Sequence, residues 1–301
     1  SAGLNFGASF TDVPGGTATW TFNGGTNYKN DTGSAAVTIT KATPTVTATG
    51  GTFTYDTTLH AGSGLATGVL SEVLSPAVTL SYVGTGSTSY GPTATAPTNA
   101  GTYEVTAHFA GNTNYLAGDS APAALTINKA AQAIAVTTHA PTNAVYNTGF
   151  TVAATANSGL AVAFSNGGVC SNSGAAFTMT SGTGICDVNY DQAGDSNYNP
   201  ATQVVEHVTA VKAPATVTLS NLAQTYDGTP KSASASTAPG GLTVDITYNG
   251  SPTAPTNAGS YAVVGTINDT NYQGSASGTL VIDKAHTTTT VTVLGATYDG
   301  N

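Results

Sequence analysis

Short runs in which hydrophobic and polar residues alternate recur along the whole chain. Three clear examples occupy residues 78–82, 103–107 and 242–248, where every second side chain is apolar. A period of two is typical of β-strands that bury one face. Glycine and proline are frequent between the runs, and no stretch of the sequence has the 3.6-residue period of an amphipathic helix. The pattern therefore predicts an all-β chain of many short strands.

A second pattern repeats at a longer interval. An Asn-Tyr pair is followed, 12 to 14 residues later, by a Lys-Ala pair, and this combination occurs four times. The tyrosines are Tyr28, Tyr115, Tyr198 and Tyr272, and the lysines, called stop lysines below, are Lys41, Lys129, Lys212 and Lys284. Successive stop lysines are 88, 83 and 72 residues apart, and a small domain with one core has this size. A fixed internal period indicates one supersecondary unit repeated along the chain.

These landmarks divide the chain into five segments. We expect the rear part of a module in residues 1–42, complete modules in 43–130, 131–213 and 214–285, and the start of another module in 286–301. Several short strands per module, with turn signals between them, predict antiparallel β-sandwiches. Because no Gly/Ser linker separates the modules, we expect them to be arranged end to end, with joints that limit bending.

Some elements can be placed within these segments. Residues 16–22 are expected to form a strand that ends at an Asn-Gly-Gly turn at 23–25. In the second complete module we expect strands at 150–156 and 160–164. The Asn-Gly dipeptide at 166–167 is of the type that forms two-residue hairpin turns, so a turn is expected there.

Composition restricts the partners. Charged residues make up 7% of the chain, against about 25% in an ordinary domain. All six basic residues are lysine and the net charge is −9, which argues against nucleic acid and against anionic membranes as partners. No apolar run approaches the ~18 residues of a membrane span, so we expect none in this segment. The only two cysteines, Cys170 and Cys186, fit an oxidising compartment better than a metal site.

The repeated strings resemble a known family, the bacterial immunoglobulin-like repeats called MBG domains. The matching strings are Tyr-Asp-Gly at 226–228 and 298–300, Ala-Pro-Thr-Asn-Ala-Gly-x-Tyr at 96–103 and 254–261, the Asn-Tyr pairs, and Leu-x-Ile-x-Lys-Ala at 125–130 and 280–285. The segment 131–213 resembles a related repeat with paired cysteines and the string Gln-Ala-Gly-Asp-Ser-Asn-Tyr at 192–198. The resemblance implies tandem Ig-like sandwiches that act as stalks and spacers in large secreted or surface-attached proteins. It offers no catalytic residue to carry over, so no enzyme activity, cofactor or metal is expected.

Two tyrosines and the cysteine pair are the candidate structural sites. Tyr103 and Tyr261 follow Ala-Gly-x, as in the tyrosine corner of Ig-type sandwiches, where the hydroxyl bonds to nearby backbone. The alternative is an ordinary half-buried strand tyrosine. Cys186 precedes Tyr198 by 12 residues, as Tyr103 precedes its own Asn-Tyr tyrosine, so Cys186 takes the position of the corner tyrosine. The resemblance to a repeat with paired cysteines then implies a Cys170–Cys186 disulfide, which stabilises by roughly 3 kcal/mol in the chain-entropy model; the alternative is two free buried thiols.

Other polar residues of the sequence favour a structural role over a binding site. Asp187, Asp191 and Asp195 could supply oxygens to calcium, but the first belongs to an expected strand and the last to a loop, so no metal site is expected. The stop lysines could form cross-links to asparagine, although a lysine at a strand end is usually solvated, and we prefer that interpretation. The five histidines are scattered without a metal-binding or catalytic pair.

Taken together, the sequence predicts a non-catalytic structural repeat region, acting as a stalk, spacer or fibre segment of a bacterial extracellular or cell-surface protein. The expected partners are neighbouring modules of the same chain and other copies in a fibre. The runner-up is an adhesin-type module that binds a glycan or a partner protein, which a cluster of exposed aromatic side chains on one face would favour. We also expect the 301 residues to be a segment of a longer repeat protein.

Overall fold

The chain is all-β. The computed structural model describes residues 3–299, and every regular element within these limits is a strand. Because residues 3–299 contain no helix, none in that range could cross a membrane. Contacts between residues divide the chain into two units, which are described separately: residues up to Gln132 together with Ala193–Ala201, and Ala133–Gln192 together with residues from Thr202 onward.

The first unit begins with a single antiparallel sheet. Its strands are β1 (Gly3–Phe6), β2 (Gly15–Asn23) and β3 (Asp31–Thr38), in the order β1-β2-β3. Half-buried and exposed residues alternate along β2, as the expected strand at 16–22 requires, and the Asn-Gly-Gly turn follows it. Among the described residues no second sheet packs on this one. Phe6 in β1 and Tyr28 in the turn after β2 are both more than 70% exposed.

Residues 43–130 of the same unit form two sheets. The smaller pairs β4 (Thr45–Thr49) with β6 (Ser63–Thr67), and the larger has the order β5-β10-β8-β7, with β9 beside β8. These strands are β5 (Gly51–Thr54), β7 (Thr79–Gly84), β8 (Gly101–Phe109), β9 (Gly118–Asp119) and β10 (Ala123–Asn128). Alternate residues of β8 are buried, including Tyr103, Val105, Ala107 and Phe109, as the period-two pattern predicts.

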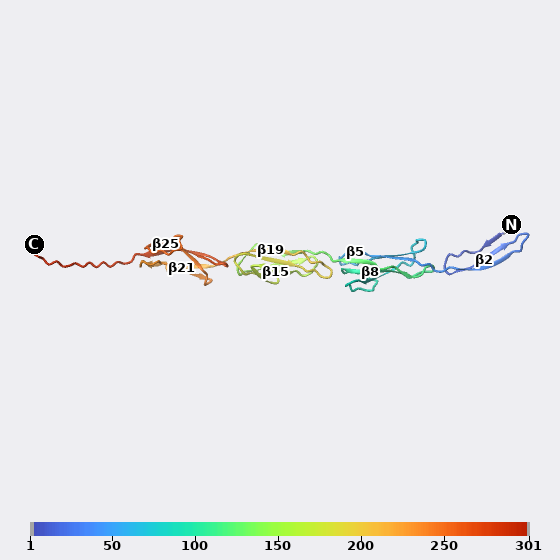
Figure 1. Ribbon diagram of the computed structural model, residues 1–301, viewed down its shortest axis with the longest axis horizontal. Coiled ribbons are helices and arrows are strands. Elements are labelled where there is room, and N and C mark those ends of the chain that lie inside the picture. The colour runs from blue at the N-terminus through green and yellow to red at the C-terminus, as the bar shows by residue number, and fades with distance from the viewer. Residues whose placement is uncertain (1–2, 300–301) are drawn as a thin grey trace. The chain divides into compact units, whose positions relative to one another are not determined.

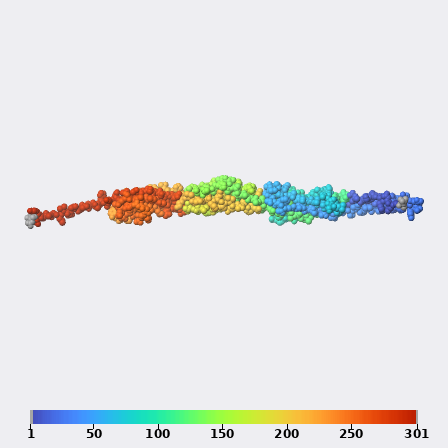
Figure 2. All heavy atoms as spheres, turned by 90° about the horizontal axis from the view of Figure 1, so that it is seen from above, coloured from blue at the N-terminus to red at the C-terminus, as the bar shows by residue number. Residues whose placement is uncertain are grey.

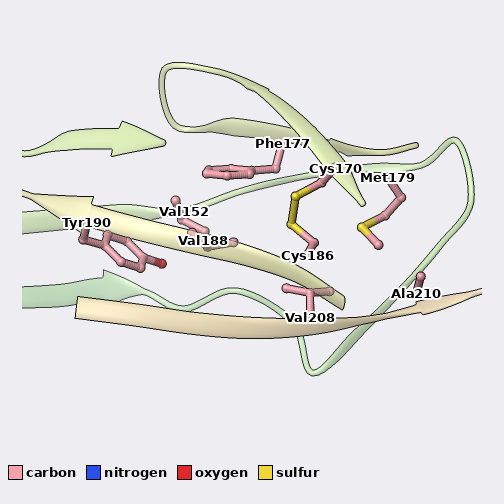
Figure 3. Close-up of a cluster of buried hydrophobic side chains, with 9 residues drawn as sticks. All are labelled: Val152, Cys170, Phe177, Met179, Cys186, Val188, Tyr190, Val208 and Ala210. Atoms are coloured by element: carbon pink, nitrogen blue, oxygen red, sulfur yellow. A yellow bond between two sulfur atoms is a disulfide. The ribbon is translucent and has the colours of Figure 1, made fainter. Parts of the chain in front are cut away.

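In the second unit, residues 133–192 and 202–213 form three sheets around a disulfide-containing core. The sheet orders are β11-β14, β13-β17-β16 and β12-β19-β18-β15. The strands are β11 (Ile134–Thr138), β12 (Asn143–Val145), β13 (Gly149–Thr151), β14 (Ala153–Ala156), β15 (Ala163–Gly168), β16 (Cys170–Ser173), β17 (Ala176–Met179), β18 (Ile185–Asp191) and β19 (Val204–Val211). Figure 3 shows the buried cluster, in which the disulfide lies beside Phe177, Met179 and Val208.

Three local expectations for this part of the chain are wrong. The strand expected at 150–156 is broken at Val152, because its two halves pair with different strands and the Val152 side chain is buried between them. The strand expected at 160–164 begins only at Ala163. The Asn-Gly dipeptide at 166–167 is not a turn, because both residues continue β15 in its pairing with β18. The chain reverses after Gly168, whose φ of 69° suits glycine.

Residues 213–283 of the second unit repeat the two-sheet arrangement. One sheet pairs β21 (Thr216–Ser220) with β23 (Ser234–Ala238), and the other has the order β22-β27-β25-β24. Figure 1 labels one strand of each sheet, β21 and β25. The second sheet contains β22 (Ala223–Thr225), β24 (Val244–Tyr248), β25 (Gly259–Ile267) and β27 (Ser275–Asp283), and a short parallel pair joins β20 (Ala213–Pro214) to β26 (Tyr272–Gln273). Residues 286–299 continue as an extended thread that forms no strand, visible as the thin red tail in Figure 2.

The expectation of an all-β fold built from Ig-like sandwiches is confirmed, with one difference in strand direction. In each complete segment one edge pair is parallel: β5 with β10, β12 with β19, and β22 with β27. An early strand therefore leaves the smaller sheet and runs beside the last strand of the larger sheet in the same direction. Alternation of polar and apolar residues fixes which face of a strand is buried, but it does not reveal the direction of its neighbour.

Candidate interface between repeats

Each of the first three Lys-Ala pairs lies against a loop from further along the chain. The three loops, called joint loops here, occupy residues 112–115, 195–198 and 269–272. All three have the sequence Asx-x-Asn-Tyr, where Asx is asparagine or aspartate. The first two contacts lie within the first unit, because residues 193–201 belong to it, and the third lies within the second unit.

The first residue of each joint loop folds the loop on itself. In the third loop the Asp269 carboxylate accepts hydrogen bonds from the backbone N–H groups of Asn271 and Tyr272, at 2.7 and 3.0 Å. Asp195 and Asn112 make the same pair of bonds in their own loops. The distances are 2.8 and 2.8 Å for Asp195, and 3.0 and 2.9 Å for Asn112. A side-chain oxygen that accepts from the backbone two residues on is an Asx turn, which orders a loop locally.

The backbone oxygen of that same residue accepts a hydrogen bond from a stop lysine. The lysine Nζ lies 2.6 Å from Asn112 O for Lys41, 2.5 Å from Asp195 O for Lys129, and 2.5 Å from Asp269 O for Lys212. The interpretation of these lysines as merely solvated is therefore wrong. A charge-assisted bond to a carbonyl is stronger than a neutral one, although exposure to water reduces its contribution.

The asparagine of each loop binds a backbone N–H of the preceding repeat. Asn271 Oδ1 accepts from Gly182 N, Asn197 Oδ1 from Ala100 N, and Asn114 Oδ1 from Val13 N, each at 2.9 Å. The second loop adds a bond from Asn197 Nδ2 to Asn99 Oδ1 at 3.2 Å, and the first adds one from Asn114 Nδ2 to Asp12 Oδ1 at 2.6 Å. An amide side chain thus satisfies a turn donor that no strand partner reaches.

The alanine after each stop lysine pairs with the loop through its backbone. Ala213 N donates to Asn271 O at 2.8 Å, and Ala215 N donates to Gln273 O at 2.8 Å. The alanines after Lys41 and Lys129 make the same parallel pairing to Tyr115 and Tyr198. Each joint loop therefore extends the backbone hydrogen bonding of the repeat before it.

At two joints the loop tyrosine packs on a tyrosine of the preceding repeat that lies 14 or 17 residues after that repeat's first stop lysine. Tyr272 lies edge-on to Tyr146 with ring centroids 5.4 Å apart, and Tyr198 lies edge-on to Tyr55 at 5.3 Å. Such pairs contribute about 0.5–1.5 kcal/mol beyond area burial. At the first joint no aromatic ring in residues 3–299 takes the equivalent position, and Tyr115 instead hydrogen-bonds to Glu72. That bond lowers the pKa of the Glu72 carboxyl and raises the pKa of Tyr115.

The two candidate corner tyrosines each hold a turn through the hydroxyl group. Tyr103 Oη donates to Asn99 O at 2.7 Å, and Tyr261 Oη donates to Asn257 O at 3.0 Å. Tyr103 is only 3% exposed, and its burial raises the pKa of the phenol. Because Asn99 and Ala100 also bind Asn197, the hydroxyl of Tyr103 fixes a turn that takes part directly in a joint.

Cys186 replaces the tyrosine at the corresponding position of its own segment. Tyr103, Cys186 and Tyr261 pair in register with Leu125, Val208 and Leu280, each of which lies four residues before a stop lysine. A disulfide joins Cys186 on β18 to Cys170 on β16, with Cα atoms 5.3 Å apart, and so links two different sheets (Figure 3). Both cysteines are buried, at 5% and 0% exposure.

The three aspartates weighed as calcium ligands face different partners. Asp187 pairs with His207 at 2.7 Å, Asp191 accepts from Gln203 at 2.8 Å, and Asp195 forms the Asx turn of its joint loop. Within residues 3–299 no group of three or more His, Cys, Asp or Glu side chains is arranged to hold a metal ion. The role of Asp195 was missed because its signal, an Asx three residues before each Asn-Tyr tyrosine, appears only when the four pairs are aligned; Gly25 breaks it in the first.

Comparison with known proteins confirms the family resemblance over one segment. Residues 215–286 match the family model described as the MBG domain. Among solved structures, the chain is similar to Sidekick-1 immunoglobulin domains 1-4, with 11% identity over 92% of this chain and 84% of that chain and a TM-score of 0.30. It is also similar to surface layer protein SbsC, domains 1-6 (13% identity, 91% and 45% coverage, TM-score 0.23), and to Drosophila N-cadherin EC1-4 (9%, 90% and 83%, TM-score 0.29). TM-scores of this size support no conclusion about function. No curated protein matches the chain.

Proposed function

We propose that the chain is a non-catalytic structural repeat region, a stalk, spacer or fibre segment whose modules hold one another through the joint loops. These modules are the ones that the sequence predicts in residues 43–130, 131–213 and 214–285. The observation that carries the proposal is that one set of contacts recurs at three positions: a stop lysine on a loop carbonyl, an asparagine on a turn N–H, and a parallel backbone pair. A repeat protein whose stability depends on nearest-neighbour interfaces has this organisation.

The contacts are numerous enough to resist bending at a joint. At the third joint, four hydrogen bonds and one ring contact connect residues 146–213 with 269–273. Each neutral hydrogen bond contributes about 0.5–1.5 kcal/mol, so together they outweigh the thermal energy of about 0.6 kcal/mol several-fold. A flexible connection would instead contain a Gly/Ser linker, and Lys212 leads directly into β20.

A bacterial extracellular or cell-surface location is part of the same proposal. It is supported by the MBG-domain match at residues 215–286 and by the buried disulfide, since structural disulfides persist in oxidising compartments. The absence of catalysis is part of the same proposal. His207 and Asp187 form an exposed pair across β18 and β19, and His108 hydrogen-bonds to Asp119 on β9 and to Ser81 on β7.

Backbone ¹⁵N relaxation of the chain tests the proposal. We expect one rotational diffusion tensor to fit residues 134–191 and 216–283, because the third joint couples them. Separate tensors with independent correlation times for these two ranges would show a freely bending joint and would overturn the spacer proposal.

A second candidate function, glycan binding by an adhesin-type module, is favoured by one observation. An open hollow of about 580 Å³ beside the second joint is lined by hydroxyl and amide side chains, by Tyr90 and by Lys129. Against it, the hydroxyls of Tyr90 and Tyr103 already donate to backbone oxygens. A glycan array separates the candidates: specific retention of one sugar class, lost in a Lys129→Ala chain but kept in a chain with Lys29→Ala, an exposed lysine that does not line the hollow, would favour the adhesin.

A further inference from the structure

The far end of the segment 214–285 carries a hollow that no part of residues 3–299 fills. It has a volume of about 380 Å³ and is lined by Tyr226, Asn257, Ala258, Lys284, Ala285 and Thr287. Its lining is mostly apolar, although a lysine and an asparagine stand at its rim. The extended thread of 286–299 leads away from β27 and leaves the hollow open.

Five of these six residues have a counterpart at the occupied second joint. The repeated strings align Tyr226 with Tyr55, Asn257 with Asn99, Ala258 with Ala100, Lys284 with Lys129, and Ala285 with Ala130. Each counterpart contacts the joint loop 195–198 or its flanks: a ring contact to Tyr55, amide bonds to Asn99 and Ala100, the Lys129 ammonium on a carbonyl, and a backbone pair at Ala130. The hollow therefore presents the complete receiving side of a joint.

The residues that line the hollow are more exposed than their counterparts at the second joint. Tyr55, Ala100 and Ala130 are half-buried, whereas their counterparts Tyr226, Ala258 and Ala285 are exposed. The Ala258 N–H and the Lys284 ammonium make no hydrogen bond to any residue in 3–299, although the equivalent groups do so at the second joint. Tyr261 nevertheless holds the 257–258 turn in the same way as Tyr103 holds its own turn. The receiving side is thus formed before anything binds to it.

We propose that this hollow is a docking socket for an Asx-x-Asn-Tyr loop supplied by a further module of the same kind that continues the chain through residues 286–301. The proposal rests on the joint function argued above and names the partner of its open end. A second copy of this chain is the weaker occupant, because its loops 112–115, 195–198 and 269–272 are already engaged in its own joints. Its remaining Asn-Tyr pair has Gly25 where the Asx should be, and Tyr28 N bonds instead to Gly24 O.

The test extends the chain by one module of known sequence. A second copy of residues 214–285 is attached directly after Ala285, which reproduces the Lys-Ala-Pro sequence of 212–214 at the new joint. Amide hydrogen exchange is then measured at Ala258 in the original and in the extended chain. We expect the appended loop to slow exchange at Ala258 by about tenfold or more, as a bound and desolvated N–H requires. Asn271→Ala in the appended copy alone should return Ala258 to its original rate, since it removes the acceptor.

Two internal amides make the outcomes distinct. Gly182 N–H reports on the third joint in the same molecule, and Val263 of the appended copy reports whether that copy is folded. An unchanged rate at Ala258, with Gly182 and the appended Val263 both protected, overturns the socket but leaves the proposed function standing. An unprotected Gly182 overturns both. If Lys284→Met in the extended chain removes the protection of the Ala258 amide, the result would further support the socket. If the Ala258 amide stays fully protected when Asn271 of the appended copy is replaced by alanine, the result would contradict it.

Discussion

A single methyl group at Gly182 should weaken the third joint. This glycine is buried although it lies in a loop, and its φ is outside the left-handed region, so alanine can adopt its backbone conformation. A Cβ placed there would lie 2.8 Å from Asn271 Cα and 2.8 Å from Thr270 O. Both are backbone atoms of the joint loop, which cannot move aside as a flexible side chain could.

The magnitude follows from the close contact. Overpacking such a contact costs about 1–3 kcal/mol. Replacing a glycine at a permissive φ gains about 0.4–1 kcal/mol through the unfolded chain, and this gain raises the free energy of unfolding but does not offset the opening of a joint between folded modules. We therefore expect Gly182→Ala to destabilise the closed joint by about 1–3 kcal/mol, and each 1.4 kcal/mol corresponds to a tenfold change in the opening equilibrium.

Amide exchange at position 182 measures that opening directly, because its N–H is held by Asn271 Oδ1 at 2.9 Å. We expect exchange there to be about 5- to 150-fold faster in the G182A chain than in the wild type. Gly240→Ala is the matched control: its φ is also permissive, and the nearest atom to its Cβ is Thr237 O at 3.9 Å. The control should be neutral or slightly stabilising.

An exchange rate at position 182 that is unchanged or slower in the G182A chain would refute the close approach of the joint loop. The same conclusion would follow if G182A and G240A raised the free energy of unfolding equally, because both would then act only through the unfolded chain.

Three further predictions concern the modules themselves. Replacing Cys170 and Cys186 together by serine should cost roughly 3 kcal/mol of unfolding free energy, measured by urea denaturation; no shift in the midpoint would contradict it. Tyr261→Phe should cost about 1 kcal/mol by leaving Asn257 O without its partner, visible as a lower melting temperature of residues 214–285. Burial of the Glu206 carboxyl opposes ionisation, but hydrogen bonds from Ala140 N, Tyr190 and His139 outweigh it and lower its pKa. The stability that this carboxylate contributes is therefore present above its unfolded pKa of about 4.3 and lost as pH falls through the lower folded value; a Glu206→Gln chain should melt with a weaker dependence on pH between 5 and 3.

The sequence predicted well whatever depends on side-chain alternation and on repeated landmarks. The strands around Tyr103 and Tyr261 follow from period-two patterns, and the position of Cys186 follows from its distance to the next Asn-Tyr pair. Strand direction was not predictable in this way, because the parallel edge pairs depend on an early strand changing sheets. The break at Val152 was not predictable either, because the residues on both sides of it look like one continuous apolar run.

The joint was harder to predict because its residues act across modules. Lys212 looks like an exposed lysine at the end of a strand until the carbonyl of Asp269, 57 residues later, is placed beside it. Gly182 looks like any loop glycine in the sequence. A side chain is excluded there by the nearby backbone of Asn271 and not by the φ of Gly182 itself. A single module contains only half of each contact, so only comparison of successive repeats would reveal it.

The distance distribution across the third joint tests the central claim most directly. Genetically encoded spin labels at Thr178 and Ser277, both exposed strand positions, would report it by double electron–electron resonance. If the joint loop couples its neighbours, the wild-type chain should give one narrow distribution, and a chain with both Gly182→Ala and Asn271→Ala should give a clearly broader one. A broad wild-type distribution that these two substitutions leave unchanged would contradict the account.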